Sequence, residues 1–181
     1  MIPERKKIRL AVSRYLGRGI YFVTMCCEGR RPIFRDSLLA SWIVEKLKVV
    51  SEANGFGVHA YCVMPDHIHV IVEGLRNGSD MERFVKAFKQ GTGFEYKKKS
   101  GQHLWQRRYY DHILRATDSL DAVMWYVWLN PVRAGLCANA WNYPHSGSFT
   151  MDWSGEVQNA VGWVPPWKGS GSGSGLVSRK I

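Results

Sequence analysis

The sequence contains no run of eighteen consecutive apolar residues, and this absence argues against a membrane-spanning helix. The basic N-terminal residues are not followed by an apolar stretch, so we expect no secretory signal. No CxxC spacing occurs among the four cysteines, so the thiols are expected to be reduced, in a cytoplasmic compartment. Each cysteine is predicted to be a small buried apolar residue.

Positive charge and aromatic rings are abundant. The 181 residues carry a formal net charge of +10, which favours binding to phosphate backbones. Eight tryptophans and eight tyrosines provide flat faces on which unpaired bases can stack. A hydrophobic share of 45% predicts a folded domain with a core. The composition therefore points to a globular protein that binds single-stranded nucleic acid.

Strand and helix patterns follow one another along the chain. Strands are predicted where β-branched and aromatic residues gather, at residues 19–27, 57–64, 67–73 and 104–114. Helices are predicted where apolar residues have helical spacing, at residues 36–54, 80–99 and 119–134. Pro65 and Asp66 suit a tight hairpin turn, and Asp118 is expected to cap the last helix. This order predicts an α+β, ferredoxin-like (RRM-like) antiparallel sheet with helices on one face and an added C-terminal helix.

The composition changes toward the C-terminus. We expect a single domain over residues 1–150 and an extension of open role over residues 151–168. Residues 169–181 begin with alternating glycine and serine, which is typical of a flexible tail.

Two histidines follow the predicted turn, at positions 67 and 69. Side chains alternate along a strand, so His67 and His69 share one face while Ile68 points into a core. Imidazoles about 7 Å apart along one face of a strand can chelate a single cation. The pair therefore predicts a metal site.

A tyrosine and an Asn-Pro step lie on the last predicted helix. At 100° per residue its apolar stripe is formed by Leu120, Val123, Met124, Val127 and Trp128. Tyr126 falls on the polar side, with Asn130 and Arg133 on the same face. Pro131 removes a helical hydrogen bond and predicts a kink or an end at Asn130, which would free the Asn130 side chain to turn toward a ligand. Taken alone, these residues fit better with a surface tyrosine followed by an Asn-Pro helix stop.

The two groups of residues make chemical sense together. A phenol is a weak nucleophile near neutral pH because its pKa is about 10. Opposite a metal-bound phosphate, it can attack phosphorus and form a phosphotyrosine bond that stores the energy needed for rejoining. Two imidazoles with an amide oxygen suit Mg²⁺ or Mn²⁺.

Three segments resemble a known family. PDHIH at 65–69 resembles the histidine–hydrophobe–histidine motif of single-tyrosine transposases, and YVWLNPVRAG at 126–135 is similar to their nucleophile helix. LWQRRY at 104–109 is similar to a segment of the REP-associated tyrosine transposases. The resemblance spans residues 14–145 and implies a bacterial, nucleoid-associated enzyme that cleaves single-stranded DNA near hairpins.

The resemblance also implies roles for individual residues. Tyr126 would be the catalytic residue bound to the 5′ phosphate, and His67, His69 and Asn130 would be the metal ligands. Candidate DNA-binding residues are Arg14, Lys86, Lys89, Gln106, Arg107, Arg108 and Arg133. Trp105, Tyr109 and Tyr110 alternate along a predicted strand, so only one subset of them can face DNA.

Two other functions fit the same sequence. A non-catalytic module that binds single-stranded nucleic acid explains the charge and the aromatic residues without using the histidine pair. A zinc-stabilised structural protein is geometrically possible because Cys62 would lie opposite His69 in the hairpin. The sequence leaves open whether the protein is a monomer or a homodimer.

Overall fold

The computed structural model describes residues 15–153 and 178–180. The strands and helices of its first part follow the predicted order: β1 Ile20–Cys26, α1 Ser37–Ala53, β2 Phe56–Met64, β3 His67–Gly74, α2 Met81–Ser100 and β4 Arg108–Ile113. Then come α3 Leu120–Trp128, α4 Asn130–Arg133 and two short strands, β5 Ser146–Gly147 and β6 Ser178–Lys180. Single 3₁₀ turns lie at Glu28–Arg30, Ile33–Arg35 and Ala140–Asn142.

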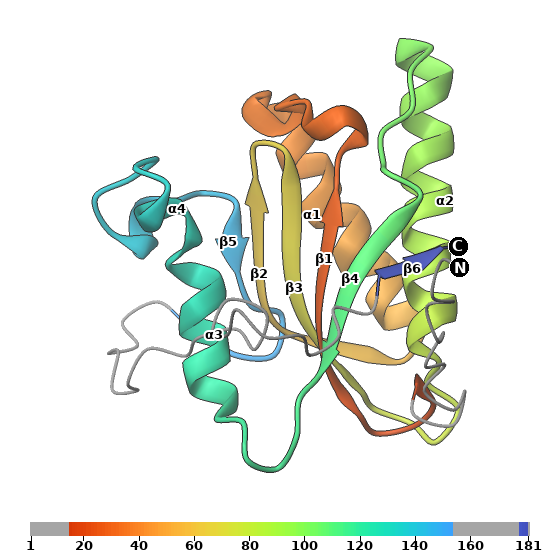
Figure 1. Cartoon of the computed structure of the whole chain (residues 1–181), viewed down its shortest axis with the longest axis vertical. Helices are drawn as coiled ribbons and strands as arrows, with labels where there is room; N and C mark the ends of the chain where they lie inside the picture. The colour runs from red at the N-terminus through yellow and green to blue at the C-terminus, as the bar shows by residue number, and fades with distance from the viewer. Residues whose placement is uncertain (1–14, 154–177, 181) are drawn as a thin grey trace, which may run out of the picture.

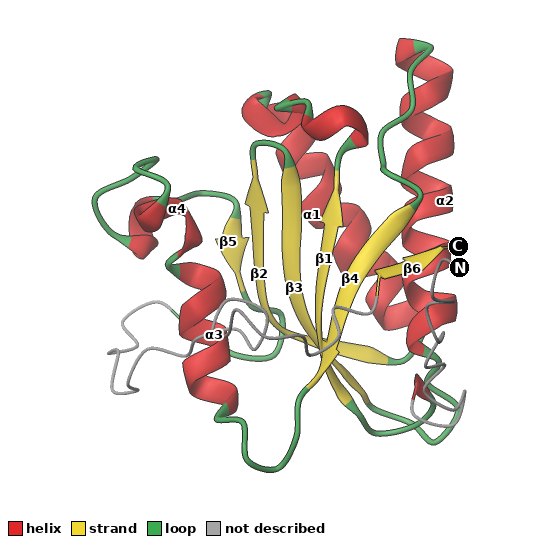
Figure 2. Cartoon of the chain, viewed as in Figure 1, coloured by secondary structure: helices red, strands yellow, loops and turns green. Residues whose placement is uncertain are grey.

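The strands form one antiparallel sheet in the order β5-β2-β3-β1-β4-β6 (Figures 1 and 2). β1 lies between β3 and β4, so the two β-α-β halves interlock around it. The two-residue turn Pro65–Asp66 joins β2 to β3 and pairs Met64 with His67, as predicted. The α+β fold with an antiparallel sheet is therefore confirmed.

The two faces of the sheet carry different helices. Val23, Ile68 and Val70 point into a core shared with α1 and α2, and α1 passes behind the strands in Figure 1. Phe22, Cys62 and Ile71 point the other way, into a second cluster formed with α3. The added C-terminal helix thus covers part of the face opposite α1 and α2.

Polar side chains mark where the helices begin. Asp36 accepts hydrogen bonds from the backbone amides of the first turn of α1, and Asp80 caps α2 in the same way. The prediction that Asp118 caps α3 is wrong, because Ser119 Oγ accepts from Ala122 N instead. The Asp118 carboxylate turns back and accepts from Arg115 N, closing the turn before the helix.

β4 is shorter than the predicted strand at residues 104–114. Trp105 forms only an isolated bridge with Cys27, and regular pairing with β1 is reached further along, where Tyr110 lies opposite Thr24. In the segment between Trp105 and Tyr110, the carbonyls of residues 106–108 accept hydrogen bonds from the ammonium of Lys89. These carbonyls therefore turn toward α2.

The predicted extension and tail lie mostly outside the described residues. Of the tail at 169–181, the structure describes only β6, which pairs with β4. Within the described ranges no helix is long and apolar enough to cross a membrane. The four cysteines are free thiols, and Cys26, Cys27 and Cys62 are buried, as predicted. The prediction is wrong for Cys137, which is only partly buried.

Candidate active site

The two imidazoles meet at the start of β3. His67 and His69 lie on the same face of the strand, as predicted from alternation, and their rings stand nearly perpendicular with centroids 4.6 Å apart. Their Nε2 atoms are separated by 3.0 Å. The Nε2 atoms of the two imidazoles therefore converge on one small region on the α3 side of the sheet.

Neighbouring side chains hold each ring by its other nitrogen. His67 Nδ1 lies 2.5 Å from an Asp66 carboxylate oxygen, and His69 Nδ1 lies 2.7 Å from Thr24 Oγ1. A carboxylate at Nδ1 favours the His67 tautomer whose Nε2 carries a lone pair, which is the form that binds a metal, and the Thr24 hydroxyl can accept the corresponding proton of His69 when a metal is bound. Burial also lowers the pKa of His67, although the hydrogen bond with Asp66 opposes this, and the shift favours the neutral imidazole.

The sequence did not assign a role to Thr24 or Asp66. Asp66 directly precedes His67, so its position in the motif was the available signal. Thr24 comes from a distant strand, and only the β1–β3 register, which pairs it with His69, brings it to the site. Phe22 lies two residues before Thr24 on the same face of β1, is paired with Ile71, and stacks on the His69 ring with centroids 5.4 Å apart.

Tyr126 faces the sheet rather than solvent. Its ring centroid lies 6.5 Å from that of His69 and 6.0 Å from that of Phe22, and the residue is 8% exposed. The prediction that it lies on a polar face was therefore wrong. α3 is buried on almost every side, because the segment after α4 packs against it through Trp141 and Trp153.

α3 ends two residues after Tyr126. α3 stops at Trp128 and a new turn, α4, begins at Asn130, as the Asn-Pro step predicted. Asn130 Nδ2 donates to the carbonyls of Tyr126 and Val127, at 3.0 and 3.1 Å. The prediction that the helix end frees the Asn130 side chain is therefore wrong, because its amide nitrogen is bonded back to α3, and only Oδ1 is left as a potential ligand.

Arg133 completes the surroundings of the tyrosine. Its guanidinium donates to the Tyr126 carbonyl at 2.5 Å and lies 4.4 Å from the centre of the Tyr126 ring. A guanidinium over an aromatic face is an attractive cation–π arrangement. The phenol ring therefore contacts both a cation and aromatic rings of the sheet.

The chain is similar in sequence to known proteins. A family model described as "Transposase IS200 like" matches residues 17–129. The chain belongs to the IS200-like transposase family. It is 26% identical over 158 residues to the REP-associated tyrosine transposase of Escherichia coli K12, with 79% of this chain and 89% of that protein covered. A Haemophilus influenzae relative, also named for the REP-associated tyrosine transposases, is 27% identical over 153 residues, covering 77% and 84% of the two chains.

A solved structure supports the fold of this family member. A REP-associated tyrosine transposase bound to a REP hairpin superposes with a TM-score of 0.66 at 21% identity. The match covers 91% of this chain and 94% of that one. The antiparallel sheet and its helices are thus shared across nearly the whole length of both proteins.

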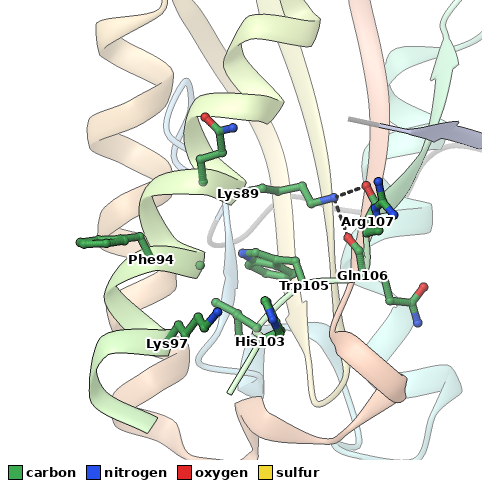
Figure 3. A pocket seen from close by; sticks show the side chains of 10 residues that line it. Lys89, Phe94, Lys97, His103, Trp105, Gln106 and Arg107 are labelled. Atoms are coloured by element: carbon green, nitrogen blue, oxygen red, sulfur yellow. Dashed lines mark hydrogen bonds between the residues drawn. The ribbon is translucent and has the colours of Figure 1, made fainter. Parts of the chain in front are cut away.

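The candidate DNA-binding residues of this family member are spread over both faces. Lys86, Arg107, Arg108 and Arg133 are exposed, Gln106 is partly buried, and Arg14 lies outside the described residues. The prediction that Lys89 contacts DNA is corrected by the structure, because Lys89 is only 7% exposed. Its ammonium donates to the carbonyls of Gln106 and Arg107 (Figure 3), and also to that of Arg108. Burial lowers its pKa to about 8. Its contacts give it a structural role.

A cavity of about 320 Å³ adjoins Lys89 on the α2 side. Lys97, His103 and Trp105 lie together in it, whereas the Gln106 side chain points away from Trp105 (Figure 3). Trp105 belongs to the core under α1 and α2, so this cavity opens on the face opposite Tyr126. It is separate from the imidazole pair.

The described residues do not support the alternative function, a structural protein stabilised by zinc. Cys62 does pair with His69, as predicted, but its Sγ contacts Met64 Sδ at 3.6 Å. Burial raises the pKa of the Cys62 thiol to about 12, which disfavours the thiolate. Among the described residues, no three His, Cys, Asp or Glu side chains gather in a metal-binding group.

Proposed function

We propose that this transposase cleaves and rejoins single-stranded DNA near hairpins through a 5′-phosphotyrosine intermediate. Tyr126 is the nucleophile, and His67, His69 and Asn130 are the metal ligands. One observation carries the proposal: the Tyr126 ring lies 6.5 Å from the ring of His69, whose Nε2 lies 3.0 Å from that of His67. The phenol and the imidazole pair thus face one gap from two different elements of the fold.

The residues at this gap suit a divalent cation. The two Nε2 atoms converge, the Nδ1 atoms are engaged, and Asn130 begins α4 with its Nδ2 bonded to the carbonyls of Tyr126 and Val127, which leaves its amide oxygen to act as a ligand. Nitrogen ligands combined with an amide oxygen favour Mn²⁺ or Mg²⁺. When bound, the cation would neutralise phosphate charge and make phosphorus a better electrophile.

The chain's own residues orient the nucleophile. Arg133 and Phe22 hold the phenol ring from two sides, which restricts the direction of attack. In the reaction the Tyr126 Oη–P bond forms and the P–O3′ bond breaks. The phenol proton is lost to water, and the 3′ oxygen gains a proton to become a hydroxyl. Attack of that hydroxyl on the phosphotyrosine reverses the step and rejoins the strand without ATP.

Single-stranded DNA with hairpin structure is the proposed partner. The family and the REP-associated relatives support a DNA substrate, and the structurally similar transposase was solved with a REP hairpin. Because one chain supplies both the tyrosine and the imidazoles, a monomer suffices for chemistry. A bacterial, nucleoid-associated cytoplasmic location follows from such a substrate.

The proposal is tested by removing the Tyr126 hydroxyl and measuring whether a covalent protein–DNA adduct still forms. A labelled single-stranded hairpin library is incubated with the protein and Mn²⁺, and adducts are separated on denaturing gels. Wild type should give a shifted covalent band that Tyr126→Phe lacks. The melting temperature of Tyr126→Phe should stay close to that of wild type. Tyr96→Phe, on α2 at the other face, should retain the band.

An adduct that persists in Tyr126→Phe would remove this tyrosine from the mechanism. If the wild-type protein forms no adduct but binds the hairpins in a salt-sensitive way that chelators do not change, the protein is a non-catalytic DNA-binding module.

A further inference from the structure

A row of paired residues crosses the sheet from His69 to Tyr110. In β1, Thr24 pairs with His69 on one side and with Tyr110 on the other. Residues paired directly in this way point to the same face of a sheet. Strands lie about 4.8 Å apart, so Tyr110 is about 10 Å from His69 along the row. Tyr110 is therefore on the same face as the imidazole pair, two strands away.

Alternation along β4 separates its side chains into two sets. Tyr109 is buried on the α2 side, where the Lys89 ammonium lies 5.7 Å from its ring centre. Asp111 also faces that side and accepts a hydrogen bond from the Tyr15 hydroxyl at 2.8 Å. Arg108 and Tyr110 belong to the opposite set and are both exposed, Tyr110 at 37%.

The cover provided by α3 does not extend to this strand. α3 packs on β2 and β3, on the side where β5 lies, whereas β4 lies beyond β1 (Figure 1). Thr24 and His69 are both buried, at 8% exposed, whereas Tyr110 in the next strand is 37% exposed. The open face thus starts at the edge of the candidate active site and carries an aromatic ring and a guanidinium.

We propose that Arg108 and Tyr110 form a subsite for one unpaired nucleotide of the DNA strand that runs through the active site. The base stacks on the Tyr110 ring, and the phosphate pairs with the Arg108 guanidinium. The two residues are two positions apart on one face, about 6.6 Å by the strand rise, so a single nucleotide can touch both. This inference rests on the proposed function, because it takes DNA as the substrate.

The subsite is tested with a hairpin that carries oligothymidine arms on both sides, in EDTA so that no cleavage occurs. Fluorescence anisotropy gives the affinity of the full chain. Tyr110→Ala should weaken binding about tenfold, as expected for the loss of one stacked base, and Tyr110→Phe should stay close to wild type. Phe94→Ala is the matched control, because Phe94 is 72% exposed on α2 and should not affect binding.

An abasic scan locates the nucleotide. Replacing one thymidine at a time by an abasic nucleotide should weaken wild-type binding about tenfold at one arm position, and that penalty should vanish in Tyr110→Ala. Arg108→Ala should reduce the slope of log K against log salt by about one, whereas Lys48→Ala, on α1, should leave it unchanged.

The outcomes separate the subsite from the proposed function. If wild type binds the probe and forms the covalent adduct, but Tyr110→Ala keeps the wild-type affinity and abasic profile, the subsite is refuted and the proposed function stands. If wild type neither binds the probe nor forms an adduct with the library, the proposed function fails and the subsite fails with it.

Discussion

Thr24→Val isolates the hydrogen bond that orients His69. Thr24 Oγ1 lies 2.7 Å from His69 Nδ1 at a buried position. Valine keeps the branched shape and suits a strand, so the change removes the hydroxyl with little effect on packing. His69 Nδ1 then loses its hydroxyl partner, and the ring can rotate or change tautomer more easily. The expected result is a weaker metal site in a folded protein.

The magnitude follows from the role of such partners. Loss of a group that holds a metal-binding histidine typically lowers metal affinity about 10- to 100-fold. That corresponds to about 1.4 to 2.8 kcal/mol of binding free energy. Loss of this hydrogen bond at a buried position should also lower the free energy of unfolding by about 1–3 kcal/mol. Both effects are measurable in one set of variants.

Mn²⁺ affinity is measured by titration calorimetry, and stability by urea unfolding. Thr24→Ser restores the hydroxyl and should recover most of the affinity. Thr92→Val is the matched control: Thr92 is buried on α2, and its hydroxyl accepts from Trp105 Nε1 at 2.8 Å. It should lose similar stability without losing affinity. Equal Mn²⁺ affinity in folded Thr24→Val and wild type would refute the role assigned to this hydrogen bond.

Two predictions concern buried charges on the α2 side. Lys89→Met should lower the free energy of unfolding by about 1–3 kcal/mol, because carbonyls such as that of Gln106 lose their donor. The salt dependence of its DNA binding should stay at the wild-type slope, whereas exposed Lys86→Ala should reduce that slope by about one if Lys86 contacts phosphate. Burial raises the pKa of Asp111 to about 6, so the folded protein holds a proton that the unfolded chain, with a pKa near 3.9, releases between these values. Wild-type stability should therefore fall as the pH rises from 4 through 6, and Asp111→Asn should remove this fall, making the variant more stable than wild type by up to about 3 kcal/mol at pH 7. Urea unfolding across this pH range checks it, and parallel curves for the two proteins would contradict the buried-carboxyl explanation.

Short-range patterns in the sequence were sufficient for most of the fold. The two-residue turn at Pro65–Asp66, the alternation around His67 and His69, and the helical spacing of apolar residues each involve neighbours along the chain. Such patterns determine which face a side chain takes within its own element. The order of these elements was then enough to predict the antiparallel sheet, and the Asn-Pro step was enough to predict the end of α3.

Local patterns in the sequence could not predict the contacts between segments that are distant along the chain. Tyr126 was expected on a solvated face because a helix considered alone has one apolar stripe, but α3 is packed from the sheet on one side and from residues 140–153 on the other. Lys89 was expected to be exposed because lysines usually are, yet it meets three carbonyls of the segment leading into β4.

The amino-acid sequence by itself determined the paired histidines on one strand face, the tyrosine and its Asn-Pro helix end, and hence the family. Only the tertiary structure decided that Thr24 supports His69, that Arg133 covers the Tyr126 ring and that Tyr110 lies open beside the site. The physical reason is that strand register and helix docking depend on the packing of the whole core, which no local pattern specifies.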